Sequence, residues 1–277
     1  MLITQRKKVL PGFSISLGSS LFFACLIILL PISALLMQLS KMTLEQYWEV
    51  ITNPQVIAAY KVTLISAGVA SLFNAIFGML MAWILTRYNF PGRIFLDGLI
   101  DLPFALPTAV AGLTLTELFS RNGWYGNLLA HFNIQVSYTW LGIALAMAFT
   151  SAPFVIRTVQ PVLEELGPEY EEAAETLGAS PLQSFFRIIL PEVGPALLAG
   201  TVLSFTRSLG EFGAVIFIAG NIAWKTEVTS LMIFIRLQEY DYPAATAIAS
   251  VILVASLVLL FTVNILQGRF GRRIGGY

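Results

Sequence analysis

The chain has 277 residues, of which 57% are hydrophobic and only 12% are charged, and its mean hydropathy is +0.78. Soluble domains average about 25% charged residues, so this composition argues against a soluble protein and indicates a polytopic membrane protein. The formal net charge is zero, which leaves no basic surface to neutralise the phosphates of nucleic acid.

Six apolar stretches are long enough to cross a membrane, because about 20 helical residues span ~30 Å of hydrocarbon. They cover residues 15–37, 61–86, 94–117, 137–156, 194–220 and 243–267. The first follows a basic start, but it is too long for the core of a signal peptide and no small-residue cleavage site follows it, so we expect it to be retained. The sequence therefore predicts an all-α integral membrane protein with six transmembrane helices.

Lysine and arginine are enriched in cytoplasmic loops, and this bias predicts the orientation. With the N-terminus inside, the cytoplasmic side holds ten basic residues, namely Arg6, Lys7, Lys8, Arg87, Arg93, Arg157, Arg187, Arg269, Arg272 and Arg273. The other side holds five, namely Lys41, Lys61, Arg121, Lys225 and Arg236. Both termini and the loop at 157–193 are therefore predicted to be cytoplasmic.

The third apolar stretch is interrupted by Pro103 and Pro107, and Thr108 follows the second proline. Proline removes a backbone hydrogen bond and kinks a membrane helix, which is tolerated next to protein or a cavity. Pro107 and Thr108 are therefore candidates for the lining or gate of a pore. The same pattern equally fits a kink that is merely packed.

The loop between the fourth and fifth stretches begins with an acidic helix after Pro168. Glu169, Glu171 and Glu172 fall in its first turn, where carboxylates are favoured by the helix dipole. Gly178 lies where a left-handed C-terminal cap is expected. The pattern predicts a short helix that ends at this glycine.

A second short helix is predicted to follow, because Ser180 and Gln183 fit a capping box. We expect this helix to end at Leu190-Pro191, just before the fifth membrane crossing. Small residues give the first helix a surface for close approach, namely Ala173, Ala174 and Gly178. Such a hairpin suggests a docking site at the membrane surface, although a solvated amphipathic helix has the same composition.

The fifth stretch carries Arg207 and Glu211, which are four residues apart and can meet on one helical face together with Ser204 and Ser208. A charged residue within a membrane helix is costly and usually faces protein or water. Two interpretations remain open. Arg207 and Glu211 neutralise each other as a structural pair, or Arg207 and the hydroxyl groups line the route of an anion.

The loop resembles the EAA motif of ABC-importer permeases, in the residues Glu172-Ala173-Ala174, Gly178 and Ile188-Ile189-Leu190-Pro191. Three further segments resemble the sulfate/thiosulfate branch of these permeases, namely Asp101–Thr108, Asn122–Gly126 and Ser204–Gly213. The segment Ser204–Gly213 also resembles the corresponding segment of molybdate permeases, so a related oxyanion is the alternative substrate. The resemblance implies the type I (MetI-like) permease fold.

By this resemblance, Glu171, Glu172, Ala173, Ala174, Gly178, Leu190 and Pro191 would couple the chain to an ATPase subunit. The implied organisation is an N-terminal segment (1–55) with the first helix, a permease core (56–268) with the EAA loop at 160–192, and a cytoplasmic tail (269–277). The implied partners are a second, similar permease chain, two copies of the ATPase, a periplasmic binding protein and membrane lipid. The implied location is a bacterial inner membrane.

No phosphate-binding loop of the type G-x-x-x-x-G-K-[ST] occurs in the sequence, so we expect this chain to bind no cofactor. The resemblance implies that ATP-Mg is used by the partner ATPase. Hydrolase and zinc-protease motifs are also missing from the sequence, which argues against an enzyme. A self-contained secondary anion transporter is the rival class. Such carriers often contain inverted repeats, and no convincing repeat is found here.

Overall fold

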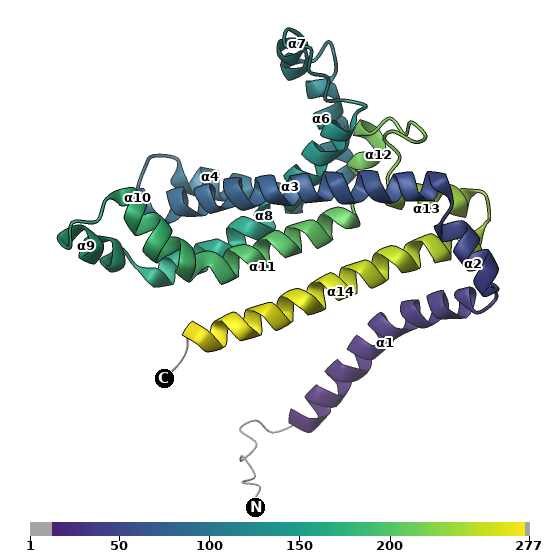
Figure 1. Cartoon of the computed structure of the whole chain (residues 1–277), viewed down its shortest axis with the longest axis horizontal. Helices are drawn as coiled ribbons and strands as arrows, with labels where there is room; N and C mark the ends of the chain where they lie inside the picture. The colour runs from purple at the N-terminus through teal and green to yellow at the C-terminus, as the bar shows by residue number, and fades with distance from the viewer. Residues whose placement is uncertain (1–12, 275–277) are drawn as a thin grey trace, which may run out of the picture.

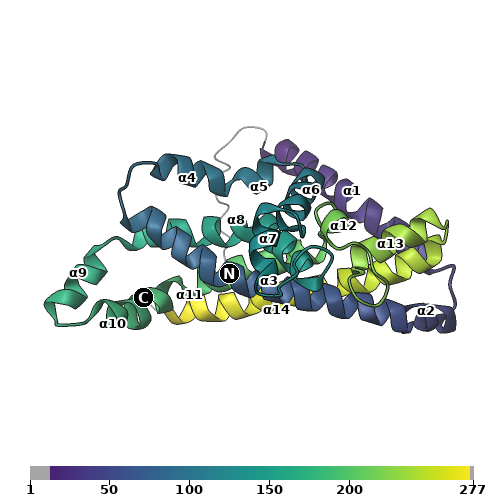
Figure 2. The same ribbon diagram turned by 90° about the horizontal axis from the view of Figure 1, so that it is seen from above.

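The computed structural model describes residues 13–274, and from residue 263 onward it describes the backbone but, Ile265 apart, not the side chains (Figures 1 and 2). Every regular element within these residues is helical, so the predicted all-α class is confirmed. In chain order the helices are α1 (Phe13–Leu39), α2 (Leu44–Ile51), α3 (Pro54–Arg87), α4 (Arg93–Ile100), α5 (Leu102–Ala105), α6 (Thr108–Phe119), α7 (Trp124–Ala130), α8 (Trp140–Leu166), α9 (Glu169–Thr176), α10 (Pro181–Ser184), the π-helical turn η1 (Phe185–Ile189), α11 (Leu190–Leu209), α12 (Val215–Ile218), α13 (Thr229–Gln238) and α14 (Tyr242–Ile274). The basic residues at 6–8, which contribute to the predicted orientation, lie outside the described residues.

Five helical runs in the described part of the chain are long and apolar enough to cross a membrane. They are Phe13–Leu39, Pro54–Arg87, Trp140–Leu166, Pro181–Leu209 and Tyr242–Thr262. The remaining predicted crossing is divided into α4, α5 and α6, of which the longest has 12 residues. Leu106 between α5 and α6 is extended, with ψ of 135°, because the ring of the following Pro107 disfavours a helical backbone at the residue before it.

The predicted helix end at Leu190-Pro191 is wrong, because one helical run continues from Pro181 to Leu209. In the π-helical turn η1, the Leu190 N–H donates to the carbonyl of Phe185, five residues earlier. This change of hydrogen-bond register places Pro191 in the first turn of α11, where its missing N–H is tolerated. The predicted extension of the fifth crossing to residue 220 is also wrong, since α11 ends at Leu209 with Gly210 as its C-cap.

Helices α3, α8 and α11 lie side by side and form the core of the bundle (Figure 1). They meet around Val155 of α8, which is completely buried. A Cβ atom on Gly78 of α3 would lie 2.7 Å from Val155 Cγ1, and one on Gly200 of α11 would lie 2.8 Å from Val155 Cα. Small residues allow membrane helices to approach closely, so these two glycines determine the spacing of the core.

Short helices connect the long ones at both ends of the bundle. Helices α9 and α10 lie at one end, together with the end of α14, whereas α2 and α13 lie at the other (Figure 1). Helix α1 diverges from α14, and none of its residues is buried in the isolated chain (Figure 1). The molecule therefore has one compact core and one end that carries the predicted hairpin.

Candidate functional site

The α9–α10 hairpin has the caps that its sequence predicts. Gly178 has φ of +82°, and the Ala179 N–H donates to the Ala174 carbonyl at 3.0 Å, which closes the end of α9. The Ser180 hydroxyl accepts from the Gln183 N–H, and the Gln183 side chain accepts from the Ser180 N–H at 2.9 Å, so the capping box is present. Both short helices are thus defined by local bonds.

The side chains of the hairpin point in two directions. Ala174 is buried against the protein, whereas Glu172 and Ala173 are exposed. Large apolar side chains are also exposed here, among them Leu177 and Leu182. The predicted surface of small residues is therefore divided: Ala174 packs inward, while Ala173 and Gly178 belong to an outer surface that combines acidic and apolar groups.

Arg87, at the end of α3, clamps this hairpin to the core. Its Nε atom lies 2.7 Å from Glu171 Oε1, and its two terminal nitrogens donate to the carbonyls of Leu163 and Gly167, each at 3.0 Å. The guanidinium also lies over the Trp83 ring, and the Arg87 side chain is only 12% exposed. Glu171 therefore faces its own chain, unlike the neighbouring Glu172.

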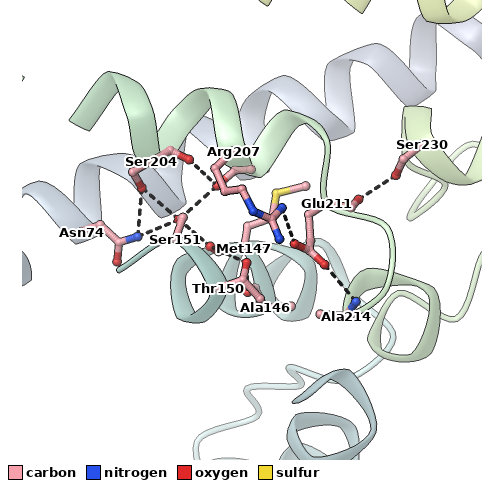
Figure 3. A network of polar contacts seen from close by, with 11 residues as sticks. Asn74, Ala146, Met147, Thr150, Ser151, Ser204, Arg207, Glu211, Ala214 and Ser230 are labelled. Atoms are coloured by element: carbon pink, nitrogen blue, oxygen red, sulfur yellow. Dashed lines mark hydrogen bonds and ion pairs between the residues drawn. The ribbon is translucent and has the colours of Figure 1, made fainter. Parts of the chain in front are cut away.

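A second cluster of polar side chains lies inside the core (Figure 3). The Asn74 amide of α3 donates to Ser151 Oγ of α8 at 2.9 Å and to Ser204 Oγ of α11 at 3.1 Å. Ser208 Oγ lies 2.8 Å from the Ser204 carbonyl, to which it donates, and 3.2 Å from Ser151 Oγ. All four residues are buried, so these groups join three helices in this conformation instead of lining an open route.

Arg207 and Glu211 form the ion pair that their spacing predicts, with 2.7 Å between Nη1 and Oε2 (Figure 3). The Glu211 side chain is 1% exposed and that of Arg207 is 35% exposed. Glu211 Oε1 accepts from the Ala214 N–H at 3.0 Å, and the Glu211 carbonyl accepts from Ser230 Oγ at 2.7 Å. Glu211 thus organises the loop that follows α11.

The structure brings this loop to the other predicted pore residues. Thr108 begins α6 and Pro107 precedes it. A Cβ atom on Gly213 would lie 2.1 Å from Thr108 Oγ1, so the loop after Glu211 packs directly on the start of α6. Pro107, Thr108, Arg207 and Glu211 therefore belong to one region, whereas Ser204 and Ser208 face α3 and α8.

Three residues of these sites are not found by sequence reasoning, namely Arg87, Asn74 and Ser151. Arg87 ends a predicted crossing and contributes to the charge bias, but nothing in its local sequence connects it with Glu171. Of the three, only Asn74 could have been singled out from the sequence. An amide within a long apolar stretch usually forms a hydrogen bond to a neighbouring helix.

The helix arrangement is the fold of chains found in solved ABC transporters. A crystal structure of a bacterial alginate ABC transporter, in complex with its alginate pentasaccharide-bound periplasmic protein, contains a chain of the same fold. The TM-score is 0.75 at 22% identity, and the match covers 93% of each chain. An amino acid ABC transporter crystallised with histidines is less similar, with a TM-score of 0.54 at 18% identity over 82% of this chain and all of that one.

The chain belongs to the family of binding-protein-dependent transport system inner membrane components, which matches residues 74–276. It is 75% identical over all 277 residues to the sulfate transport system permease proteins CysT of Escherichia coli K12 and of Salmonella typhimurium LT2. A protein of the same name from Synechocystis is 48% identical, covering 92% of this chain and 88% of its own length. The chain is therefore a multi-pass membrane permease of an ABC importer and not an enzyme.

Proposed function

We propose that this chain is one permease subunit of an ATP-driven importer for sulfate and thiosulfate, and that it forms half of the translocation pathway. The observation that carries the proposal is the 75% identity over the whole length to two permeases named for sulfate transport. A related oxyanion such as molybdate is the alternative substrate. Sulfate, thiosulfate and molybdate are all tetrahedral divalent anions that a similar pathway would accommodate.

We further propose that residues 93–119 make a sixth, discontinuous crossing and that both termini are cytoplasmic in a bacterial inner membrane. Discontinuous helices are tolerated in membranes where neighbouring protein covers the free backbone groups. The excess of basic residues on the side of the α9–α10 hairpin supports this orientation. Figure 1 is consistent with it, because the hairpin and the end of α14 lie at the same end of the bundle.

In this proposal the outer surface of the hairpin is seated in an ATPase subunit. Exposed Leu177 and Leu182 offer apolar area for a partner to cover, and exposed Glu172 and Glu175 offer charge for the polar rim of such an interface. A second permease chain completes the pathway, a second ATPase copy serves that chain, and a periplasmic binding protein delivers the anion. ATP-Mg is bound by the ATPase, and this chain carries no cofactor.

The mechanism follows from the contacts of the hairpin. When ATP draws the two ATPase subunits together, α9 moves with them. Because Arg87 joins α9 to α3 and to the end of α8, the displacement reaches the core directly. The core helices then switch the pathway from inward-open to outward-open, and hydrolysis of ATP resets it.

Transport by the reconstituted complex tests the proposal. Proteoliposomes that contain both permeases and the ATPase, with binding protein outside and ATP inside, should accumulate radioactive sulfate. Unlabelled thiosulfate should compete more strongly than molybdate. Sulfate uptake by this chain alone would refute the importer mechanism, and preferential competition by molybdate would refute the substrate.

Replacement of Gly178 by valine is expected to reduce transport per ATP hydrolysed. The φ of +82° costs an ordinary L-residue about 1–2 kcal/mol, so the end of α9 would change. Among the described residues, none other than the two chain neighbours has an atom within 4 Å of the added Cβ, so the effect comes from the backbone and from the partner's seat. Gly178→Asn is the matched control, because asparagine tolerates this conformation. Normal coupling in Gly178→Val would contradict the role of the cap.

Replacement of Arg207 by methionine is expected to lower the amount of assembled permease, because it leaves the Glu211 carboxylate buried without its charge partner, at a cost of about 3 kcal/mol. The double variant Arg207→Met/Glu211→Gln should restore assembly, measured by size-exclusion chromatography, and should still transport sulfate. Restored assembly without transport would instead place Arg207 in the anion route.

A further inference from the structure

The segment formed by α4 and α5 lies along one side of the bundle instead of packing into it (Figure 2). None of its residues, all of which the structure describes, is buried, and Ile94 is 91% exposed. The segment begins after Gly92, whose φ is +91°, and ends at the extended Leu106. It is thus a short rigid piece between two points where the backbone can pivot.

Leu96 and Ile100 of α4 pack on the edge of the core cluster that contains Ile156, but an apolar cavity of about 300 Å³ also lies between this segment and the core. Leu96 and Ile100 of α4 line one wall, and residues of α3 and α8, among them Phe77 and Ile156, line the other. The cavity leaves part of these side chains without the dispersion contacts of a filled core, so packing alone holds α4 less firmly than it would a buried helix. The wall offers no directional bond that would determine where α4 lies.

Arg157 of α8 supplies those directional bonds. Its Nη1 atom lies 2.7 Å from Asp97 Oδ1, and its Nη2 atom donates to the Asp97 carbonyl at 2.9 Å. The same guanidinium holds both carboxylate oxygens of Asp101, at 2.9 Å from Nε and 2.6 Å from Nη2. A planar guanidinium can bridge two carboxylates in this way, whereas a lysine would act as a point charge. The Phe104 ring of α5 also rests on Phe154 of α8, at 5.3 Å between centroids.

We propose that Arg157 is a positioning residue that makes the α4–α5 segment follow α8 during transport. This inference rests on the proposed importer function. Only Gly167 and Pro168 separate α8 from α9, and Arg87 bonds to residues of both helices, so a displacement of the hairpin moves Arg157. The ion pairs pass that displacement to Asp97 and Asp101, and α5 leads on to Pro107 and Thr108.

The consequence is a continuous mechanical connection from the ATPase seat to the region around Glu211. Thr108 contacts Gly213, and Gly213 lies in the loop that Glu211 holds. Each step is a connection along the chain, a close contact or an ion pair. The step from α8 to α4 depends on one side chain, that of Arg157.

The experiment measures the distance between α4 and α8 directly. Spin labels are placed at Ile94→Cys and Glu164→Cys of a Cys25→Ser chain within the complete importer, whose other subunits carry no accessible cysteine. With Arg157 present, the distance distribution should be narrow and equal in the nucleotide-free and ATP-bound states. With Arg157→Met it should broaden and should differ between the two states.

Transport provides the second readout. Arg157→Met should lower sulfate transported per ATP hydrolysed by about tenfold, within the range of ordinary coupling energies, and Arg157→Lys should be intermediate. Arg236→Met is the matched control, because Arg236 forms a comparably exposed ion pair with Glu239 that has no connection to α4. It should change neither readout.

Two results would overturn the inference: an unchanged narrow distribution in Arg157→Met, or a distance in the unsubstituted chain that changes with nucleotide. If Arg157→Met does not assemble, Asp97→Asn serves instead, since it keeps the bonds to Asp101, and it should broaden the distribution to a smaller extent. The distance readout does not require transport. If the unsubstituted complex moves no sulfate, the proposed function fails while this measurement remains valid.

Discussion

Replacement of Arg87 by methionine is expected to abolish most transport while leaving ATP hydrolysis largely intact. The change removes the ion pair to Glu171 and two bonds to carbonyls at the end of α8. Hydrogen bonds to charged groups contribute about 1.5–3 kcal/mol each, and 1.4 kcal/mol corresponds to a factor of ten. Transport per ATP hydrolysed should therefore fall at least about tenfold, measured in proteoliposomes with the complete importer.

The controls for Arg87 use the same region of the chain. Arg93→Met removes a nearby half-buried arginine, whose side chain bonds to Asn89, and it should have little effect. Arg87→Lys keeps the charge but not the forked geometry, so it should be intermediate. Equal transport by Arg87→Met and Arg93→Met would show that the hairpin needs no connection to α3.

Replacement of Gly200 by valine is expected to destabilise the core. Its Cβ atom would lie 2.8 Å from Val155 Cα and 3.2 Å from the Phe154 carbonyl oxygen, and these backbone atoms cannot rotate aside. Helices α8 and α11 must then separate, and overpacking of this kind typically costs about 1–3 kcal/mol. The expected result is a lower melting temperature in detergent and less assembled complex.

The matched control for this variant is Gly194→Val in the same helix. Apart from the backbone of α11 itself and the adjacent residues, no atom of the described part of the chain lies within 4 Å of a Cβ at Gly194, and both substitutions exchange the same residue types in α11. The difference in melting temperature between the two variants therefore reports the α8–α11 contact and not helix propensity. A melting temperature for Gly200→Val that is as high as that of Gly194→Val would contradict the close approach.

The parts of the fold that depend only on residues close in the sequence are predictable. The caps at Gly178 and Ser180 follow from the residues within three positions of each. The interruption at Pro107 follows from the geometry of proline itself. The continuation through Pro191 is not predictable in this way, because it depends on a π-helical turn that no local propensity indicates.

In the candidate site, too, contacts between residues close in the sequence are predictable and contacts between distant residues are not. Arg207 and Glu211 are four residues apart, so helical geometry alone predicts their ion pair. Arg87 and Glu171 are 84 residues apart, and Asn74 and Ser204 are 130 apart. Such pairs form because α3 packs on α8 and α11, and that packing is decided by small residues distributed along all three helices. Spacing within one segment carries no information about it.

The extra residue of η1 has a consequence for how the permease is built. Each helical residue turns the chain by about 100°, so one inserted residue rotates everything before it by that angle relative to everything after it. As a result, Ser184 of α10 and Val193 of α11 are both buried, although they lie on opposite sides of this turn. A single deletion within residues 185–189 would therefore rotate the α9–α10 hairpin, which we propose is seated in the ATPase, without altering one amino acid of α9 or α10.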